Sequence, residues 1–223
     1  MQINKTWILS NKNKFKQEFF KKNPPGSLDK LQKAVAGVAG AGGLGSNIAV
    51  SLVRAGVQNL VIADFDRIEL SNLNRQQFFF DQVGQLKVNA LKENLLRINP
   101  LAKIKIFAEK VTRENAAFFF KDCDILLEAF DRAENKVMLA ETWSKYFPDK
   151  YIIIGSGLAG AGMNEKIKTQ KYDKIIICGD QKTQSTNENG LLSARVAAVA
   201  NLQANCAIEI LLKGVSTHDR SEQ

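Results

Sequence analysis

Residues 34 to 157 alternate short apolar segments with longer segments whose apolar residues recur at helical spacing. The segments expected to be strands are residues 34–40, 59–66, 102–110, 123–130 and 150–157, and those expected to be helices are residues 44–56, 84–100, 112–122 and 131–147. Strands that alternate with helices predict a parallel sheet with helices on both faces. Because crossovers are right-handed, such a sheet is doubly wound and binds ligands beyond the carboxyl ends of its strands.

The pattern changes after Gly162. Residues 164–180 predict a pair of antiparallel strands at the edge of the sheet. Residues 181–190 contain almost no apolar side chain and predict a mobile crossover loop, and residues 191–214 predict a long, Ala-rich helix. The expected fold class is therefore α/β: a Rossmann-like, doubly wound, mostly parallel sheet with antiparallel edge strands and a C-terminal helix.

The chain divides into one main domain with two short ends. Residues 1–26 predict a basic N-terminal helix and a linker, because Pro24 and Pro25 lack the N–H that a continued helix needs. Residues 27–213 form the predicted domain, and residues 214–223 are a tail.

Composition limits the remaining classes of protein. Apolar residues make up 45% of the chain, and no segment approaches the ~20 consecutive apolar residues of a membrane helix. The N-terminus lacks the apolar region of a signal peptide, so we expect a cytoplasmic protein without membrane contact. The net charge of +8 suits phosphates, nucleic acid or an acidic protein, and equally a solvated lysine-rich surface.

Cysteine spacing excludes two kinds of site. Cys123, Cys178 and Cys206 are an odd number, widely spaced and without any CxxC pair, so neither a disulfide framework nor a four-cysteine zinc site is encoded. Cys123 and Cys178 lie in apolar runs and are expected to be buried thiols.

The segment "GAGGLG" follows the first strand of the alternating region and begins its first helix. Gly40, Gly42 and Gly45 fit the G-x-G-x-x-G pattern, in which a tight turn brings the backbone close to a phosphate at a helix N-terminus. Asp64 ends the next predicted strand, where a carboxylate can accept hydrogen bonds from both ribose hydroxyls. These features predict a nucleotide site without identifying the nucleotide.

This pattern is most common in dinucleotide-dependent oxidoreductases, but three features argue against that class of enzyme. The sole histidine, His218, lies in the tail, and a proline separates Tyr146 from Lys150, so these two do not share a helix face. A dehydrogenase also has no evident need for Arg75 and Lys87 soon after the ribose carboxylate. No predicted helix follows a second G-x-G-x-x-G pattern, so close backbone packing is expected of its glycines, Gly155, Gly157 and Gly160.

Five segments together resemble the ThiF/MoeB family of adenylyltransferases, relatives of the ubiquitin-activating enzymes. They are "GVAGAGGLGSNIAVSLVRAGV", "VIADFD", "SNLNRQ", "VGQLKVNALKENLLRINP" and "EAFDRAENK". The chain is most similar to the short, zinc-free ThiF branch of thiamine biosynthesis. The resemblance implies a homodimer that uses ATP to adenylate the C-terminal glycine of a small ubiquitin-like sulfur carrier ending in Gly-Gly.

The resemblance also implies roles for individual residues. Gly43 would lie against the nucleotide, Asp64 would hold the ribose, and Asp131 would bind Mg²⁺ on the phosphates. Arg75 and Lys87 would contact the triphosphate and act with Asp131 in catalysis. The full set expected to bind nucleotide is Gly40, Gly42, Gly43, Leu44, Gly45, Asp64, Asp66, Ser71, Asn72, Arg75, Lys87 and Arg132, with Asn135 beside the phosphates.

Three of these residues also have simpler interpretations. Arg75 would suit a surface charge, Lys87 a solvated helix residue, and Asp131 the N-cap of the next helix. The aromatic residues 78–80 are expected to anchor the loop that contains Arg75 in the core.

The chemistry implied by the resemblance suits a site without histidine. The terminal carboxylate of a carrier is ionised at pH 7, so its attack on the α-phosphate needs no general base. The charge on the phosphates and on the departing pyrophosphate needs stabilisation, which Arg, Lys and a metal ion supply.

The chain departs from the family pattern in three respects. It lacks the paired CxxC zinc ligands, so no zinc is expected. The crossover loop, residues 181–190, has no cysteine for a covalent sulfur intermediate, and residues 1–33 have Lys14 and Lys16 but no arginine to reach a partner subunit's site.

Other functions remain open at this point. The same fold could adenylate the carrier subunit of molybdopterin synthase or a tRNA base carboxylate, although no added RNA-binding segment is visible and a nucleic-acid partner is not expected. A non-catalytic nucleotide-binding protein is the third alternative.

Overall fold

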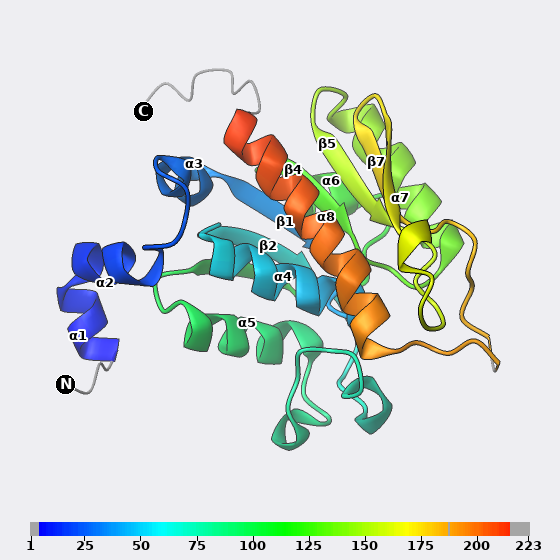
Figure 1. Cartoon of the computed structure of the whole chain (residues 1–223), viewed down its shortest axis with the longest axis horizontal. Helices are drawn as coiled ribbons and strands as arrows, with labels where there is room; N and C mark the ends of the chain where they lie inside the picture. Colours follow the sequence, from blue (N-terminus) through cyan, green and yellow to red (C-terminus); the bar gives the residue numbers. More distant parts are fainter. Residues whose placement is uncertain (1–4, 187, 215–223) are drawn as a thin grey trace.

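Seven strands form one sheet in the computed structural model, which describes residues 5–186 and 188–214 (Figure 1). The strands are β1 (Val35–Ala39), β2 (Asn59–Ala63), β3 (Lys103–Phe107), β4 (Ile125–Glu128), β5 (Tyr151–Gly155), β6 (Lys168–Tyr172) and β7 (Ile175–Gly179). Their order is β3-β2-β1-β4-β5-β7-β6, and all neighbours run parallel except β6 and β7. The predicted fold class is confirmed, including the antiparallel strands at one edge.

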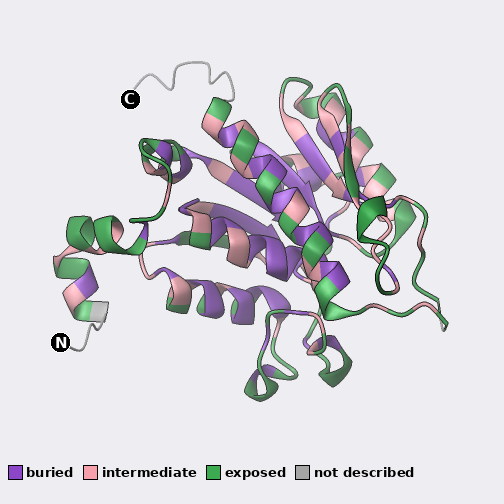
Figure 2. Ribbon diagram, in the orientation of Figure 1, coloured by how far each residue is buried: buried purple, intermediate pink, exposed green. Residues whose placement is uncertain are grey.

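Helices cover both faces of the sheet. The helices are α1 (Lys5–Ser10), α2 (Lys12–Phe19), α3 (Ser27–Lys33), α4 (Gly43–Ala55), α5 (Lys87–Ile98), α6 (Ala116–Phe120), α7 (Ala133–Tyr146) and α8 (Ser193–Lys213). Alternate strand residues face opposite layers: Leu60 and Ile62 pack with α4 and α5, whereas Val61 and Ala63 pack with α6 and α7. Figure 2 shows that α4 is mostly buried, whereas buried and exposed residues alternate along α8.

Helix α8 lies beside α4 across one face of the sheet (Figure 1). By length and composition alone α8 could cross a membrane. Gln203, in the middle of α8, is instead fully buried and donates hydrogen bonds to the carbonyls of Glu128 (2.9 Å) and Ile153 (3.2 Å). These contacts are those of a core helix that ties β4 to β5.

The basic N-terminal segment differs from the single helix expected over its first residues. Two short helices, α1 and α2, are separated at Asn11, whose φ of −127° and ψ of 42° are not helical. The Asn11 side chain donates a hydrogen bond to the Trp7 carbonyl (3.0 Å), so it competes with the helical pattern that the sequence suggests.

The second glycine pattern serves close packing, as expected. A Cβ on Gly155 would lie 2.5 Å from Leu44 Cδ1, and a Cβ on Gly157 would lie 2.0 Å from Asp180 Oδ1. All three cysteines are buried, and burial raises the pKa of the Cys123 thiol above its ordinary value. The predicted mobility of residues 181–190 remains a prediction; their described residues form no helix or strand, and His218 lies outside the described residues.

Candidate nucleotide-binding site

The turn between β1 and α4 has its shape because of two glycines. Gly40 has a φ of +103° and donates its N–H to the Ala63 carbonyl (2.8 Å). A Cβ on Gly45 would lie 1.8 Å from the Gly40 oxygen, whereas a Cβ on Gly42 would meet only Gln76, at 3.8 Å. The turn therefore folds directly onto the first turn of α4, and it leaves space at Gly42, where a phosphate would approach.

This geometry predicts that two alanine substitutions affect different properties, one the stability of the fold and the other the binding of ATP. We expect Gly45→Ala to lower the free energy of unfolding by about 3 kcal/mol or more, because the backbone of Gly40 must move away from the new methyl group. Gly42→Ala should leave stability within about 1 kcal/mol of the original and weaken ATP binding, because its methyl group projects into the phosphate space. Urea denaturation and calorimetric ATP titration measure the two effects. Equal stability losses would contradict this description of the turn.

Asp64 joins the end of β2 to the glycine turn. Its carboxylate oxygens accept hydrogen bonds from the N–H of Ala41 (2.6 Å) and the N–H of Asp66 (2.7 Å). Burial raises the pKa of Asp64 above its ordinary value, against the lowering effect of those two bonds and of Lys87. A carboxylate offers about four lone-pair sites, so acceptor capacity remains for the two ribose hydroxyls.

Lys87 is not a solvated helix residue. It is 7% exposed at the start of α5, and its Nζ lies 2.9 Å from a carboxylate oxygen of Asp66. The Lys87 N–H also donates to the Asp66 carbonyl (2.9 Å). A cation at a helix N-terminus lies at the positive end of the helix dipole, so Asp66 supplies the compensating charge.

Arg75 lies against the N-terminus of α4. A Cβ on Gly43 would be 3.7 Å from both Cγ and Nε of Arg75. The guanidinium donates to the Ser71 carbonyl (3.0 Å) and to Asn74 Oδ1 (2.8 Å). Among the residues that the structure describes, no carboxylate forms an ion pair with Arg75. A half-buried cation and a helix N-terminus thus meet here, which is the local arrangement that binds phosphate.

The loop that contains Arg75 begins with a short 3-10 turn, Leu70–Asn72, and lies below α5 in Figure 1, in teal. Ser71 is exposed, and Asn72 is buried with its side-chain oxygen accepting the N–H of Glu69 (3.1 Å). Their contacts with phosphate stay predictions. The aromatic run anchors the loop less than expected: Phe78 is buried in the core, but Phe79 and Phe80 are 53% and 78% exposed.

Asp131 follows β4, the strand next to β1. The preceding Ala129 donates its N–H to the Ala39 carbonyl (2.9 Å), so this turn adjoins the glycine turn. Asp131 is exposed and has no hydrogen bond or ion pair within the described part of the chain. Arg132, not Asp131, occupies the N-cap position of α7, without a side-chain capping bond, and Asn135 is partly exposed in its first turn.

The donor set at this turn suits Mg²⁺. Mg²⁺ prefers oxygen ligands and is usually held by one or two carboxylates together with substrate phosphates. The free carboxylate of Asp131 meets that requirement. Across residues 5–186 and 188–214, no three His, Cys, Asp or Glu side chains gather into a self-sufficient metal site.

A buried ion pair behind Asp131 was not expected from the sequence. Glu128 is fully buried, and its carboxylate lies 2.9 and 3.2 Å from Lys136 Nζ and accepts the N–H of Phe130 (2.6 Å). Burial raises the pKa of Glu128, although Lys136 opposes the shift. The pair braces the turn that presents Asp131. The sequence signal for this pair was an acidic residue at the end of an otherwise apolar strand.

A second buried pair, Asp180 and Arg195, holds the crossover loop. Arg195 also donates to the Gly162 carbonyl, and Asp180 accepts the N–H groups of Lys182 and Thr183, both at 2.8 Å. Burial acts to raise the pKa of Asp180, but the hydrogen bonds from Thr183, Lys182 and Arg195 together hold it below its ordinary value. The loop therefore begins from a fixed point beside β5 and β7.

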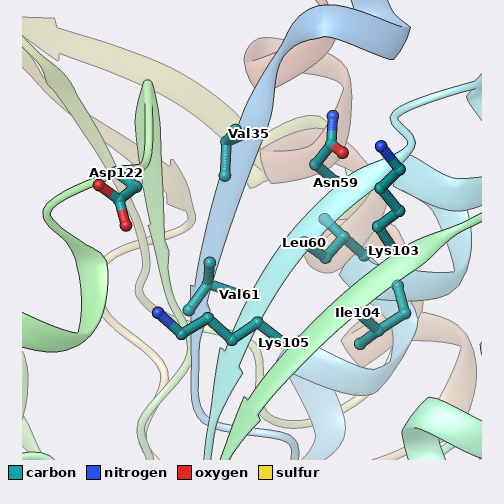
Figure 3. A pocket seen from close by; sticks show the side chains of 8 residues that line it. All are labelled: Val35, Asn59, Leu60, Val61, Lys103, Ile104, Lys105 and Asp122. Atoms are coloured by element: carbon teal, nitrogen blue, oxygen red, sulfur yellow. The ribbon is translucent and has the colours of Figure 1, made fainter. Parts of the chain in front are cut away.

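A depression of about 470 Å³ lies at the opposite end of the sheet, where β1, β2 and β3 begin (Figure 3). Val35, Asn59 and Lys103 line it at the strand starts, together with Lys105 and Asp122. Because doubly wound sheets bind nucleotides at the carboxyl ends of their strands, this depression is not the nucleotide site.

Two curated relatives share part of the chain. The sulfur carrier protein adenylyltransferase of Thermus thermophilus is 31% identical over 130 residues, which are 58% of this chain and 43% of the relative. The sulfur carrier protein ThiS adenylyltransferase of Bacillus subtilis is 35% identical over 127 residues, 56% of this chain and 38% of the relative. The chain thus spans less than half the length of these two relatives.

A solved structure and a family model extend the comparison over nearly the whole chain. The tRNA N6-threonylcarbamoyladenosine dehydratase TcdA of E. coli, solved in complex with ATP, has the same fold, with a TM-score of 0.80 over 96% of this chain and 98% of that chain at 18% identity. The model of the ThiF family matches residues 15–222. Because the match covers most of its length, the chain belongs to the ThiF family.

Proposed function

We propose that this protein is an adenylyltransferase that activates the C-terminal glycine carboxylate of a small ubiquitin-like sulfur carrier with ATP. The main support is the position of Arg75, which lies against the N-terminus of α4 and has no carboxylate partner among the described residues. The names of the Thermus and Bacillus relatives support the same reaction and a carrier protein as the substrate. We further propose a ThiS-like carrier in thiazole formation for thiamine as the specific role.

In this reaction a carboxylate oxygen of the carrier attacks the α-phosphorus of ATP. The bond to the bridging oxygen of the β-phosphate breaks, and pyrophosphate leaves with the electron pair, so no proton has to move. Asp64 would accept the ribose hydroxyls, and Arg75 and Lys87 would stabilise the negative charge on the phosphates. Mg²⁺, which Asp131 would hold, supplies further charge neutralisation when bound.

We also propose that the protein acts as a homodimer. Two lysines of the N-terminal segment have partners within the chain: Lys16 Nζ donates to Gln32 Oε1 (2.9 Å), and Lys14 lies over the Trp7 ring. Residues 1–33 contain no arginine, so the role that an arginine of a partner subunit plays in many family members would fall to another residue. Sedimentation velocity at micromolar concentration would distinguish the dimer from a monomer.

Adenylation of a tRNA base carboxylate is the second candidate. It is favoured by the net charge of +8 and by the structural likeness to TcdA, whose name states a tRNA substrate. The two candidates share the nucleotide site and differ only in the carboxylate that attacks ATP.

Three parallel reactions distinguish the candidates. Purified protein, ATP and Mg²⁺ are incubated with a Gly-Gly carrier from the same genome, with bulk tRNA, or with neither, and pyrophosphate release is measured. We expect release with the carrier alone. Release with tRNA alone would transfer the proposal to the second candidate, and ATP binding without release in any reaction would indicate a non-catalytic protein.

A further inference from the structure

A buried amide connects the glycine turn to the backbone of Arg75. Asn47, in the second turn of α4, is 6% exposed. Its Nδ2 donates to the Gly43 carbonyl (2.7 Å) and to the Arg75 carbonyl (3.0 Å), and its Oδ1 accepts Gln77 Nε2 (2.7 Å). One side chain thus fixes the distance between the start of α4 and the residue expected to contact the triphosphate.

Two neighbours strengthen the same connection. Ser46 Oγ donates to the Gly42 carbonyl (2.7 Å) and accepts the N–H of Gln77 (3.1 Å). From α5, Asn94 Nδ2 donates to the Gln77 carbonyl (3.0 Å). Residues 75–77 are therefore attached to both α4 and α5 by buried polar groups.

The identity of residue 47 is not explained by helix formation. Asparagine is a poorer helix former than the alanine and leucine residues that α4 also contains. A buried amide also loses its contacts with water unless it is hydrogen-bonded. The contacts of Asn47 with Gly43, Arg75 and Gln77 compensate for both costs, and two of them lead to predicted site residues.

We propose that Asn47 is a positioning residue, which fixes Arg75 against the N-terminus of α4 so that the site recognises the triphosphate of ATP. The inference rests on the proposed function, in which Arg75 contacts the triphosphate. Small displacements of such a group are costly, since a shift of about 1 Å can reduce a rate by roughly 10²-fold. AMP, which lacks the β- and γ-phosphates, would depend on the glycine turn and Asp64 but not on Arg75.

The test compares the dissociation constants of ATP and AMP. We expect Asn47→Ala to weaken ATP binding by about tenfold, a change in free energy comparable to that of one hydrogen bond to a charged group. The binding of AMP should be nearly unchanged. Asn59→Ala is the matched control. Asn59 Nδ2 likewise donates to two carbonyls, those of Gln32 (2.8 Å) and Ala34 (3.1 Å), but at the other end of the sheet. Asn59→Ala should lower stability and leave the ATP-to-AMP ratio of affinities unchanged.

A double-mutant cycle then shows whether Asn47 acts through Arg75. In the Arg75→Ala background, we expect Asn47→Ala to have no further effect on ATP affinity. Additive effects of the two substitutions, or equal losses of ATP and AMP affinity in Asn47→Ala, would overturn the inference while the proposed function stands. If Arg75→Ala itself leaves the ratio unchanged, the assignment of Arg75 fails and the inference fails with it.

A second variant keeps the test decisive if Asn47→Ala does not fold. Gln77 has an exposed side chain that supports Asn47 without belonging to the predicted site. Gln77→Ala should lower the ATP-to-AMP ratio in the same direction by a smaller factor. An unchanged ratio in this variant would overturn the inference.

Discussion

Replacing Arg75 by alanine should lower the rate of ATP–pyrophosphate exchange by about 10²-fold or more. The structure gives Arg75 no carboxylate partner among the described residues, so its charge is available to the phosphates and no ion pair of the protein is lost with it. Exchange of labelled pyrophosphate into ATP, with the carrier present, measures the effect. Thermal unfolding should change little, because within the described part of the chain the Arg75 side chain donates only to Ser71 and Asn74.

Two further variants complete this test, one that separates the charge of Arg75 from its shape and one control. Arg75→Lys keeps the charge but loses the planar fork of donors, so an intermediate rate is expected. Arg67→Ala is the control, since Arg67 lies in the same segment and is exposed, and it donates to the Gly84 carbonyl (2.8 Å) away from the glycine turn. A rate for Arg75→Ala as high as that for Arg67→Ala would remove Arg75 from the reaction.

The second large effect is expected at Asp131. Asp131→Asn should reduce exchange by about 10²-fold and shift the Mg²⁺ concentration for half-maximal rate upward. The substitution keeps the shape of the side chain, and the native carboxylate is exposed without hydrogen bonds among the described residues, so folding should be unaffected. A titration of exchange rate against Mg²⁺ measures both quantities.

Glu134→Gln provides the control for Asp131. Glu134 is an exposed acid in the first turn of α7, three residues further along the chain. It should keep the original rate and Mg²⁺ dependence. If Asp131→Asn also kept them, Asp131 would not be the residue that holds the metal.

Most of the fold follows from local patterns. The apolar runs of β1, β2 and β4 and the glycines around α4 identify the strand–turn–helix units, and parallel strands bring their carboxyl ends to one edge. For this reason Asp64 and the segment just before Asp131, which lie far apart in the sequence, both contact the backbone at the end of β1. The break at Asn11 depends on one side-chain hydrogen bond and had no signal in the hydrophobic pattern.

The parts of the site that the sequence could not provide are contacts between distant residues. The pairing of Lys87 with Asp66, the bracing of Glu128 by Lys136 and the link from Asn47 to Arg75 all depend on how elements pack together. The sequence assigned each of these residues to a helix, strand or loop, but it could not identify the residue with which each would form its hydrogen bond or ion pair. Buried polar residues inside apolar elements are the general signal for such contacts.

The most direct test of the central claim is ATP–pyrophosphate exchange with two forms of one carrier. One form ends in the natural Gly-Gly carboxylate, and the other ends in the corresponding amide, which keeps the surface of the carrier but removes the attacking oxygen. We expect exchange that requires Mg²⁺ and the carboxylate form and is absent with the amide. Equal exchange with both forms, or none with either, would contradict adenylation of the carrier terminus.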